Sequence, residues 1–180
     1  EKIKQAYFKV YERLGIGEQT FLTFARGGMF RQYSHEFQTI TEAGEDTIYV
    51  DRKKRIAINE EVNNDEVLEN LGLKREDLEE VRAAEVGNIF TLNDKFSKPL
   101  ELGFIDEEGA SKNVLMGCYG IGPSRLVGVI TELYGDDRGL VWPENIAPFK
   151  VYLAQLGEDE GVIKASEELY QSLTQAGITV

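Results

Sequence analysis

Cysteine and histidine are nearly absent from this sequence, which contains one of each, Cys118 and His35. A single cysteine excludes a disulfide within the chain and favours a reducing compartment, so we expect a cytoplasmic protein. A single histidine restricts any imidazole chemistry to its own surroundings, and on its own it is more typical of a structural residue than of a catalyst. Without further histidines or cysteines among the carboxylates, we predict no metal site formed by the protein alone.

Long apolar stretches and positive charge are also scarce. No run of about 18 apolar residues and no signal-type apolar segment is present, so the sequence predicts neither a membrane span nor export. The sequence has 20 lysines and arginines against 32 aspartates and glutamates, a formal net charge of −12. Its apolar content of 42% is still enough for 180 residues to bury one core, or a core and a small second unit.

The most informative segment, residues 116–128, reads MGCYGIGPSRLVG, a short apolar strand that enters a helix through a glycine-rich turn. The apolar residues after the turn recur at the spacing of an amphipathic helix: Leu126, Val129, Ile130 and Leu133. Pro123 suits the first helical position, and Gly135 suits the position after the last one. A helix N-terminus presents unpaired N–H groups to an anion, and Arg125 in the first turn therefore predicts a phosphate-binding site.

Two familiar phosphate-binding motifs do not fit this segment. A dinucleotide-binding fingerprint needs glycine at its first, third and sixth positions, but the sixth position here is Arg125. A P-loop needs a lysine followed by serine or threonine, and no such pair follows the turn. A strand-to-helix connection without any ligand stays open from these residues alone.

The segment resembles motif 3 of class II aminoacyl-tRNA synthetases, in the form found in bacterial prolyl-tRNA synthetases. Three further blocks occur in the order and approximate spacing of that family: Gly27-Gly28 with Ser34-His35-Glu36-Phe37-Gln38, Glu85-Val86-Gly87-Asn88-Ile89-Phe90 with Lys95-Phe96-Ser97, and Trp142-Pro143 with Ile146-Ala147-Pro148-Phe149. Four ordered blocks make the resemblance specific, and it covers nearly the whole chain. It corresponds to the C-terminal part of the catalytic domain and the start of the anticodon-binding domain.

The resemblance implies a proline-tRNA ligase that activates proline with ATP and transfers it to tRNA(Pro), as a homodimer in the full-length enzyme. It implies that Arg125 lies along the adenine and reaches the γ-phosphate, a cation–π contact combined with a charge-assisted hydrogen bond. Glu85 and Asn88 are expected near the nucleotide, and Mg²⁺ is expected to accompany the ATP. From the residues alone, Glu85 could equally be a solvated acid at a strand edge.

For the amino acid, the resemblance implies a pocket formed by His35, Glu36, Phe90 and Cys118. Glu36 would pair with the secondary ammonium of proline, while Phe90 and Cys118 would supply apolar wall for the ring. A nucleophilic role for Cys118 is the rival interpretation, but no base stands beside it in the sequence.

The sequence also departs from the family. Motif 1, which builds the dimer interface, and motif 2, whose arginine holds the ATP α-phosphate, are expected before Glu1, so we expect this chain alone to be inactive. Only residues 39–84 separate two blocks between which relatives carry a large editing domain. We therefore expect an insertion reduced to residues 45–84, without hydrolysis of alanyl-tRNA. Its acidic part, residues 60–80, predicts two short solvated helices joined at Gly72.

We expect an α+β fold: an antiparallel sheet with flanking helices in a partial catalytic domain over residues 1–148, and the opening of an α/β domain over residues 149–180. The expected elements of the first part are a helix ending at Gly15, strands at 20–25, 37–40 and 47–50, and a meander over 88–120 with a hairpin turn at 107–109. After a linker at 142–148, the sequence predicts a strand at 151–156, a helix at 159–176 and a strand at 178–180.

Two function classes stay open. The chain is part of an enzyme, or it is a catalytically inactive synthetase paralogue that binds nucleotide, an amino acid or a protein partner. Arg125 and the pocket block favour the enzyme. The basic run at residues 52–55 could contact tRNA, but four charges without interleaved aromatics are more typical of a solvated loop. The net negative charge argues against this chain as the main tRNA-binding surface.

Overall fold

The computed structural model describes residues 1–27 and 33–180, and its contacts divide the chain into two compact units, Glu1–Leu140 and Val141–Val180. Both strands and helices are present, so the predicted α+β class is confirmed. Gly28 of the expected glycine turn lies outside the described residues.

The first unit consists of one main sheet with helices around it. The helical elements are α1 (Lys2–Arg13), η1 (Gly17–Gln19), η2 (Glu60–Val62), α2 (Asp65–Leu71), η3 (Arg75–Asp77) and α3 (Pro123–Tyr134). The main sheet contains β1 (Thr20–Arg26), β2 (Tyr33–Ile40), β3 (Asp46–Asp51), β4 (Ile56–Asn59), β5 (Glu79–Asn93) and β8 (Met116–Ile121). Two small hairpins join β6 (Gly103–Ile105) to β7 (Ser111–Asn113) and β9 (Gly135–Asp136) to β10 (Gly139–Leu140).

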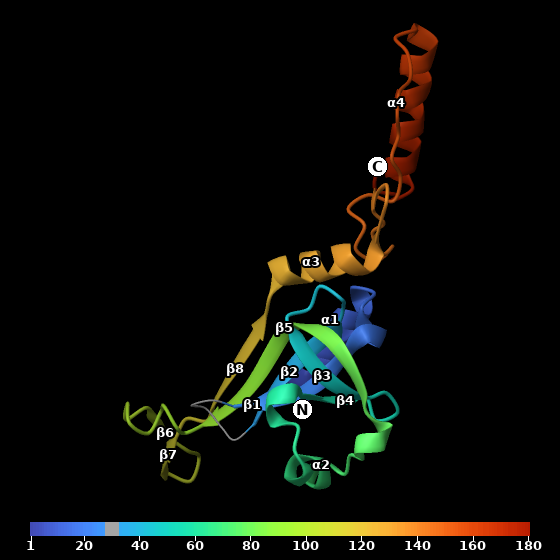
Figure 1. Cartoon of the computed structure of the whole chain (residues 1–180). Coiled ribbons are helices and arrows are strands. Elements are labelled where there is room, and N and C mark those ends of the chain that lie inside the picture. The colour runs from blue at the N-terminus through green and yellow to red at the C-terminus, as the bar shows by residue number, and fades with distance from the viewer. Residues whose placement is uncertain (28–32) are drawn as a thin grey trace. The chain divides into compact units, whose positions relative to one another are not determined.

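Five strands of the main sheet close into a ring. Their order is β2-β1-β4-β3-β5, and β2 also pairs with β5, while β8 pairs with the second half of β5. Figure 1 shows β5 as the long curved strand that joins the ring to β8. The pairings are antiparallel, as predicted, except that β1 and β4 run parallel. The exception arises because β4, which the sequence reading missed, fills the place beside β1.

Strand alternation gives the ring an inner face with two parts of different character. A buried apolar cluster on this face consists of Phe21, Ile48, Val50, Ala57 and Ala83. Because cross-strand partners point to the same side of a sheet, Gln38, which pairs with Phe21, also faces inward. Glu36 follows two residues away on the same face. The interior is therefore apolar around Phe21 and acidic around Gln38.

The outer face of the ring is covered by α1 and α2. From α1, the rings of Tyr7 and Tyr11 lie 4.9 and 5.3 Å from that of Phe37. From α2, Val67 and Leu68 are buried together with Ile58 of β4, so the acidic stretch contributes to an apolar cluster and is not only a solvated face. Residues 60–80 contain one α-helix, α2, and the two short turns η2 and η3, rather than the two predicted helices.

The ends of α2 follow the expected local rules. Asn64 caps its N-terminus by accepting a hydrogen bond from the Val67 N–H at 3.1 Å. Gly72 ends the helix in the left-handed region, with φ of +62°, where a side chain would be strained. The predicted break at Gly72 is therefore confirmed.

The region after β5 is only partly the predicted meander. The hairpin turn at 107–109 is present, but β6 and β7 form a separate two-stranded sheet. The predicted meander is interrupted between β7 and β8, where the Val114 N–H donates to the Leu102 carbonyl and the Val114 carbonyl accepts a hydrogen bond from the Ser97 hydroxyl. Helix α3 begins at Pro123 and ends before Gly135 as predicted, and it buries Leu126, Val129 and Ile130.

The second unit contains α4 (Glu160–Gln175), close to the predicted helix. Throughout residues 141–180, which are all described, the two expected strands do not form. Their only ladder-like contact is the pair of backbone hydrogen bonds from Lys150 and Val151 to the Thr179 carbonyl, at 3.0 and 3.1 Å. Two short segments without further neighbours do not make a stable sheet. Among the described residues of the whole chain, no helix has the length and apolar character that crossing a membrane requires.

Candidate functional site

The glycine-rich turn connects β8 to α3 and places Arg125. The turn is fixed on β5, because the Gly122 N–H donates to the Val86 carbonyl at 3.2 Å. Arg125 follows in the first turn of α3 and forms an ion pair with Glu45, from the loop between β2 and β3. Both side chains are about half exposed, 48% and 52%, so this pair contributes only about 0–1 kcal/mol. Arg125 can therefore exchange Glu45 for another anion at little cost.

A hollow of about 250 Å³ lies beside this turn. The residues predicted to bind nucleotide, Glu85, Asn88 and Arg125, all line it, together with Gly120 and Gly122. The Asn88 amide donates to the Glu85 carboxylate at 2.9 Å, which orients both side chains. The glycines leave backbone accessible where a side chain would narrow the hollow: a Cβ on Gly120 would lie 3.2 Å from the Asn88 amide oxygen. A larger hollow, about 510 Å³, contains Glu45 and shares only Arg125 with the first.

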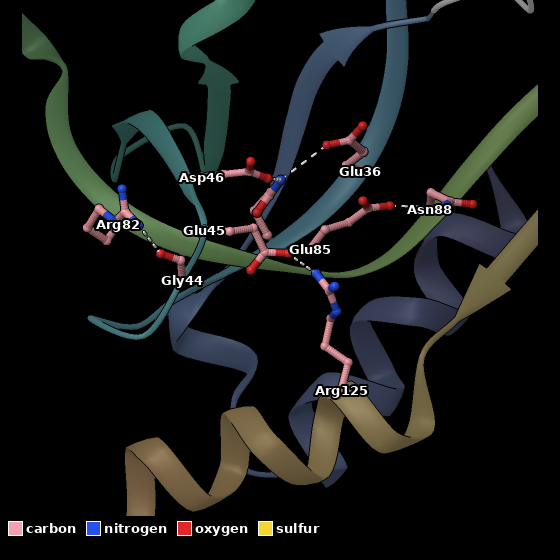
Figure 2. A network of polar contacts seen from close by, with 9 residues as sticks. Glu36, Gly44, Glu45, Asp46, Arg82, Glu85, Asn88 and Arg125 are labelled. Atoms are coloured by element: carbon pink, nitrogen blue, oxygen red, sulfur yellow. Dashed lines mark hydrogen bonds and ion pairs between the residues drawn. The ribbon is translucent and has the colours of Figure 1, made fainter.

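Glu36 is held at both carboxylate oxygens. The Ser34 hydroxyl donates to one oxygen at 3.2 Å, and the Gln38 amide donates to the other at 3.1 Å. The same amide nitrogen donates to Asp46 at 2.7 Å. Figure 2 shows Glu36, Asp46 and Glu85 converging from three strands, with Arg125 approaching from α3.

The electrostatics of this group favour a cation. Burial raises the pKa of Glu36 to about 7, the negative charge of Glu85 adds to the rise, and the hydrogen bonds from Gln38 and Ser34 oppose it. A carboxylate in this state is stabilised by an incoming positive charge, because the cation offsets both the desolvation and the repulsion from Glu85. An ammonium group fits this requirement.

The strand register connects the acidic group to the hollow. Glu36 on β2 lies opposite Asn88 on β5, which lies opposite Gly120 on β8. Two residues further along the same face, Phe90 lies opposite Cys118, an exposed free cysteine. The structure thus brings Glu36, Asn88, Phe90 and Cys118 to one continuous face across three strands.

His35 is the predicted site residue that the structure places elsewhere. It neighbours Glu36 in the sequence, and successive residues of a strand point to opposite faces. Its ring lies 4.8 Å from the Phe24 ring in an edge-on contact on the outer face. The register therefore separates His35 from the group formed by Glu36, Asn88, Phe90 and Cys118.

The sequence analysis assigned no role in the site to four residues: Ser34 and Gln38, which belong to a motif block, and Glu45 and Asp46, which do not. A usable signal was present for two of them, because Ser34, Glu36 and Gln38 alternate and would share one face of a strand. The predicted strand began only at residue 37, four residues after the observed start of β2. The positions of Glu45 and Asp46 depend on how the loop between β2 and β3 folds back, for which the sequence gives no signal.

The basic run at residues 52–55 forms the turn between β3 and β4, and three of its four charged side chains contact other parts of the chain. Arg52 pairs with Glu79 at 2.5 Å, and Lys54 donates to the Gly72 carbonyl. Arg55 donates to the Gly17 carbonyl at 2.6 Å and lies 5.2 Å from the centre of the Phe21 ring. Among the described residues, no cluster of three or more histidine, cysteine or acidic side chains is arranged to hold a metal ion.

Comparison with known proteins gives one consistent result. The family described as tRNA synthetase class II core domain (G, H, P, S and T) matches residues 1–134. The proline-tRNA ligase of Anaplasma marginale is 34% identical over 99% of this chain and 45% of its own length, and that of Wolbachia sp. subsp. Drosophila simulans is 33% identical over 94% and 42%. The chain therefore spans under half the length of these relatives.

The fold comparison agrees. The structure of prolyl-tRNA synthetase from Cryptosporidium parvum, complexed with L-proline and AMP, superposes with a TM-score of 0.62 and 19% identity. The match covers 99% of this chain and 30% of that one. At this identity the likeness establishes the fold.

Proposed function

The chain belongs to the family of class II tRNA synthetase core domains, and from this premise we propose that it acts in a proline-tRNA ligase. The reaction is ATP-dependent activation of proline to prolyl-adenylate, followed by transfer of the prolyl group to tRNA(Pro). The observation that carries the proposal is one face across β2, β5 and β8, on which the half-buried carboxylate of Glu36 lies opposite Asn88, and Asn88 lines the same hollow as Arg125. The named relatives support the choice of proline.

The hollow beside the turn takes the nucleotide in this proposal. Arg125 exchanges Glu45 for a phosphate of ATP, gaining a charge-assisted hydrogen bond, and lies along the adenine. Asn88 and Glu85 line the same hollow and contact the nucleotide. Mg²⁺ accompanies ATP, and since this ion is usually held by phosphates with one or two carboxylates, Glu85 is the candidate protein ligand.

The proline pocket lies on the neighbouring part of the same face. Glu36 pairs with the secondary ammonium, and Phe90 and Cys118 line the apolar ring. His35 was expected in this pocket, but its place on the outer face supports a structural role there. Charge neutralisation and alignment of the proline carboxylate with the α-phosphate are what such a site contributes to adenylate formation.

The finer parts of the proposal follow the family. In this proposal, residues 1–148 form part of the catalytic domain, with residues 45–84 as a reduced insertion. Residues 149–180 form the beginning of an anticodon-binding domain. The working enzyme is a cytoplasmic homodimer that binds tRNA(Pro).

The test is a comparison of adenylate analogues. Sulfamoyl adenosines carrying prolyl, alanyl or seryl groups are titrated into the 180-residue protein by calorimetry. We expect the prolyl analogue to bind most tightly. Its preference over the alanyl analogue should reach up to about a hundredfold, because one methylene in an apolar pocket changes the discrimination between ligands by roughly 10–200-fold. Equal binding of all three, or none, would contradict a proline site and favour a paralogue with another ligand.

A matched variant locates the binding. Phe90→Ala removes apolar wall from the proposed proline pocket and should erase the preference for prolyl over alanyl. Phe104→Ala removes the same type of side chain from the exposed hairpin strand β6, and it should leave the preference for prolyl over alanyl unchanged.

A further inference from the structure

Gln38 lies at the acidic end of the site, the group formed by Glu36, Asp46 and Glu85. Its side chain is fully buried, with 0% exposure, and its amide nitrogen donates to both Glu36 and Asp46, at 3.1 and 2.7 Å. Burying an amide costs free energy unless its hydrogen bonds are made, and here both donated bonds go to carboxylates, one on β2 and one on β3. Gln38 therefore links β2 to β3 directly beside the Glu36 carboxylate.

The orientation of this amide follows from the two acids. The NH₂ group must face Glu36 and Asp46, because the opposite orientation would place the amide oxygen against two carboxylates. The amide oxygen therefore points away from both acids: Gln38 Oε1 is buried and has no hydrogen-bond partner among the described residues. The fold accepts an unpaired buried acceptor in order to keep both donated hydrogen bonds.

We propose that Gln38 is a positioning residue for amino-acid binding, whose amide, anchored on Asp46, holds the Glu36 carboxylate in the orientation and charge state that a substrate ammonium requires. The proposal rests on the proposed function, since it assigns the ammonium to Glu36. Ser34 orients the other oxygen, and its hydroxyl also lies 3.4 Å from the Arg26 carbonyl on β1. Gln38 differs in linking Glu36 to a second carboxylate, Asp46 on β3.

The charges around Glu36 explain why such a donor is needed. Glu85 on β5 and Asp46 on β3 both repel a charged Glu36, and burial disfavours the charge further. The hydrogen bonds from Gln38 and Ser34 act in the opposite direction. Removing the Gln38 donor should therefore shift the ionisation of Glu36 to higher pH, and ammonium binding should follow it.

The first experiment measures Glu36 without any ligand. The carboxyl carbon of Glu36 is titrated by NMR in the 180-residue protein, in Gln38→Met, which keeps the length and removes the amide, and in Gln38→Asn, which keeps the amide and shortens its reach. We expect the midpoint, near pH 7 in the unmodified chain, to rise by about one pH unit in both variants. If Gln38→Met does not fold, Gln38→Asn decides alone. An unchanged midpoint would overturn the proposal.

The control is Thr39→Val. Thr39 is equally buried and lies on the opposite face of β2, where it shares a hydrogen bond of 2.9 Å with Thr20. This variant should lower stability without moving the Glu36 midpoint. A shift as large as that in Gln38→Met would mean that any disturbance of β2 produces the effect, and would overturn the positioning role.

The second experiment measures binding of the prolyl sulfamoyl analogue from pH 6 to pH 9. We expect Gln38→Met to bind about fivefold more weakly near pH 7 and to approach the unmodified protein towards pH 9, where Glu36 is largely ionised in both. A loss independent of pH would overturn the proposal. If the unmodified protein binds no analogue at any pH, the proposed function fails, and the NMR titration still decides whether Gln38 controls Glu36.

Discussion

Glu36 and Arg125 belong to one candidate site, but Glu36 lies in a hydrogen-bonded network on the inner face of the ring of strands, whereas Arg125 reaches the site from α3 through one exposed ion pair. Glu36 is fixed by Ser34 and Gln38 and shifted in pKa by burial. Arg125 is held by Glu45 alone among the contacts described for its guanidinium, at a surface where such a pair is weak.

The difference shows two ways of preparing a binding group. The hydrogen bonds around Glu36 are formed before the ligand arrives, so binding there needs little rearrangement, but folding must bear the cost of a half-buried carboxylate. The arginine end is stable without a ligand because Glu45 occupies it, and a phosphate only has to replace one weak partner. Substitutions at the acidic end should therefore affect stability and pH dependence, and substitutions at the arginine end should affect affinity.

The largest expected effect is that of Arg125→Ala on nucleotide binding. Removing a charge-assisted contact costs about 1.5–3 kcal/mol, or roughly tenfold to a hundredfold in ATP affinity measured by calorimetry. Arg138→Ala, which removes an exposed arginine from the turn between β9 and β10, is the matched control and should change nothing. Equal ATP affinity in Arg125→Ala would place the nucleotide elsewhere.

A substitution in the loop between β2 and β3 should disturb both the surroundings of Glu36 and those of Arg125. A Cβ on Gly44 would overlap the backbone of Ala83, so Gly44→Ala must displace the loop that carries Glu45 and leads into Asp46. We expect a loss of about 1–3 kcal/mol in the free energy of unfolding, measured with denaturant. Gly128→Ala on α3, where a Cβ meets nothing within 4 Å, should be neutral or slightly stabilising. Equal stability of the two variants would argue against the close approach at Gly44.

The acidic end predicts a specific pH dependence of stability. The pKa of Glu36 is about 7 in the folded chain against an ordinary value of about 4.5, so between these values the folded state binds more protons than the unfolded state. The Glu36 contribution to the free energy of unfolding therefore falls as the pH rises through this window. Glu36→Gln removes that fall and should be more stable than the unmodified chain at pH 8, by about 1–2 kcal/mol after allowing for partial exposure.

Denaturant unfolding at pH 5 and pH 8 measures this effect. The two proteins should differ little at pH 5 and clearly at pH 8. If the free energies of unfolding of the two proteins changed in parallel with pH, the pKa of Glu36 would be close to its ordinary value. The proposed contrast between Glu36 and Arg125 would then be wrong.

The smallest expected effect is a gain in affinity from Glu45→Gln. Without its carboxylate partner, Arg125 no longer has to leave an ion pair to meet a phosphate, and a pair worth about 0–1 kcal/mol limits the gain in ATP affinity to about fivefold. Glu42→Gln, an exposed acid on the same loop, controls for the change in net charge. Weaker ATP binding in Glu45→Gln would show instead that Glu45 helps to position Arg125 in the complex.

Several features of this protein were determined by local sequence alone. Pro123 and Gly135 bracket α3, Gly72 ends α2, and the apolar period of residues 126–133 orients α3 toward the sheet. These features were predictable because helix ends and amphipathic faces depend on residues within a few positions of one another. The motif blocks likewise pointed to Arg125, Glu85 and Asn88, which the fold does bring to one hollow.

Only the tertiary structure decided the rest. Whether His35 or Glu36 faces the site depends on the register of β2 against β1 and β5, and a shift of one residue would exchange them. The burial of Gln38 between Glu36 and Asp46, and the pairing of Glu45 with Arg125 across 80 positions of sequence, require the ring to close and the loop at Gly44 to fold against β5. Sequence patterns report which side chains share a strand or helix face, whereas the charge state and partners of a side chain depend on segments that only the folded chain brings together.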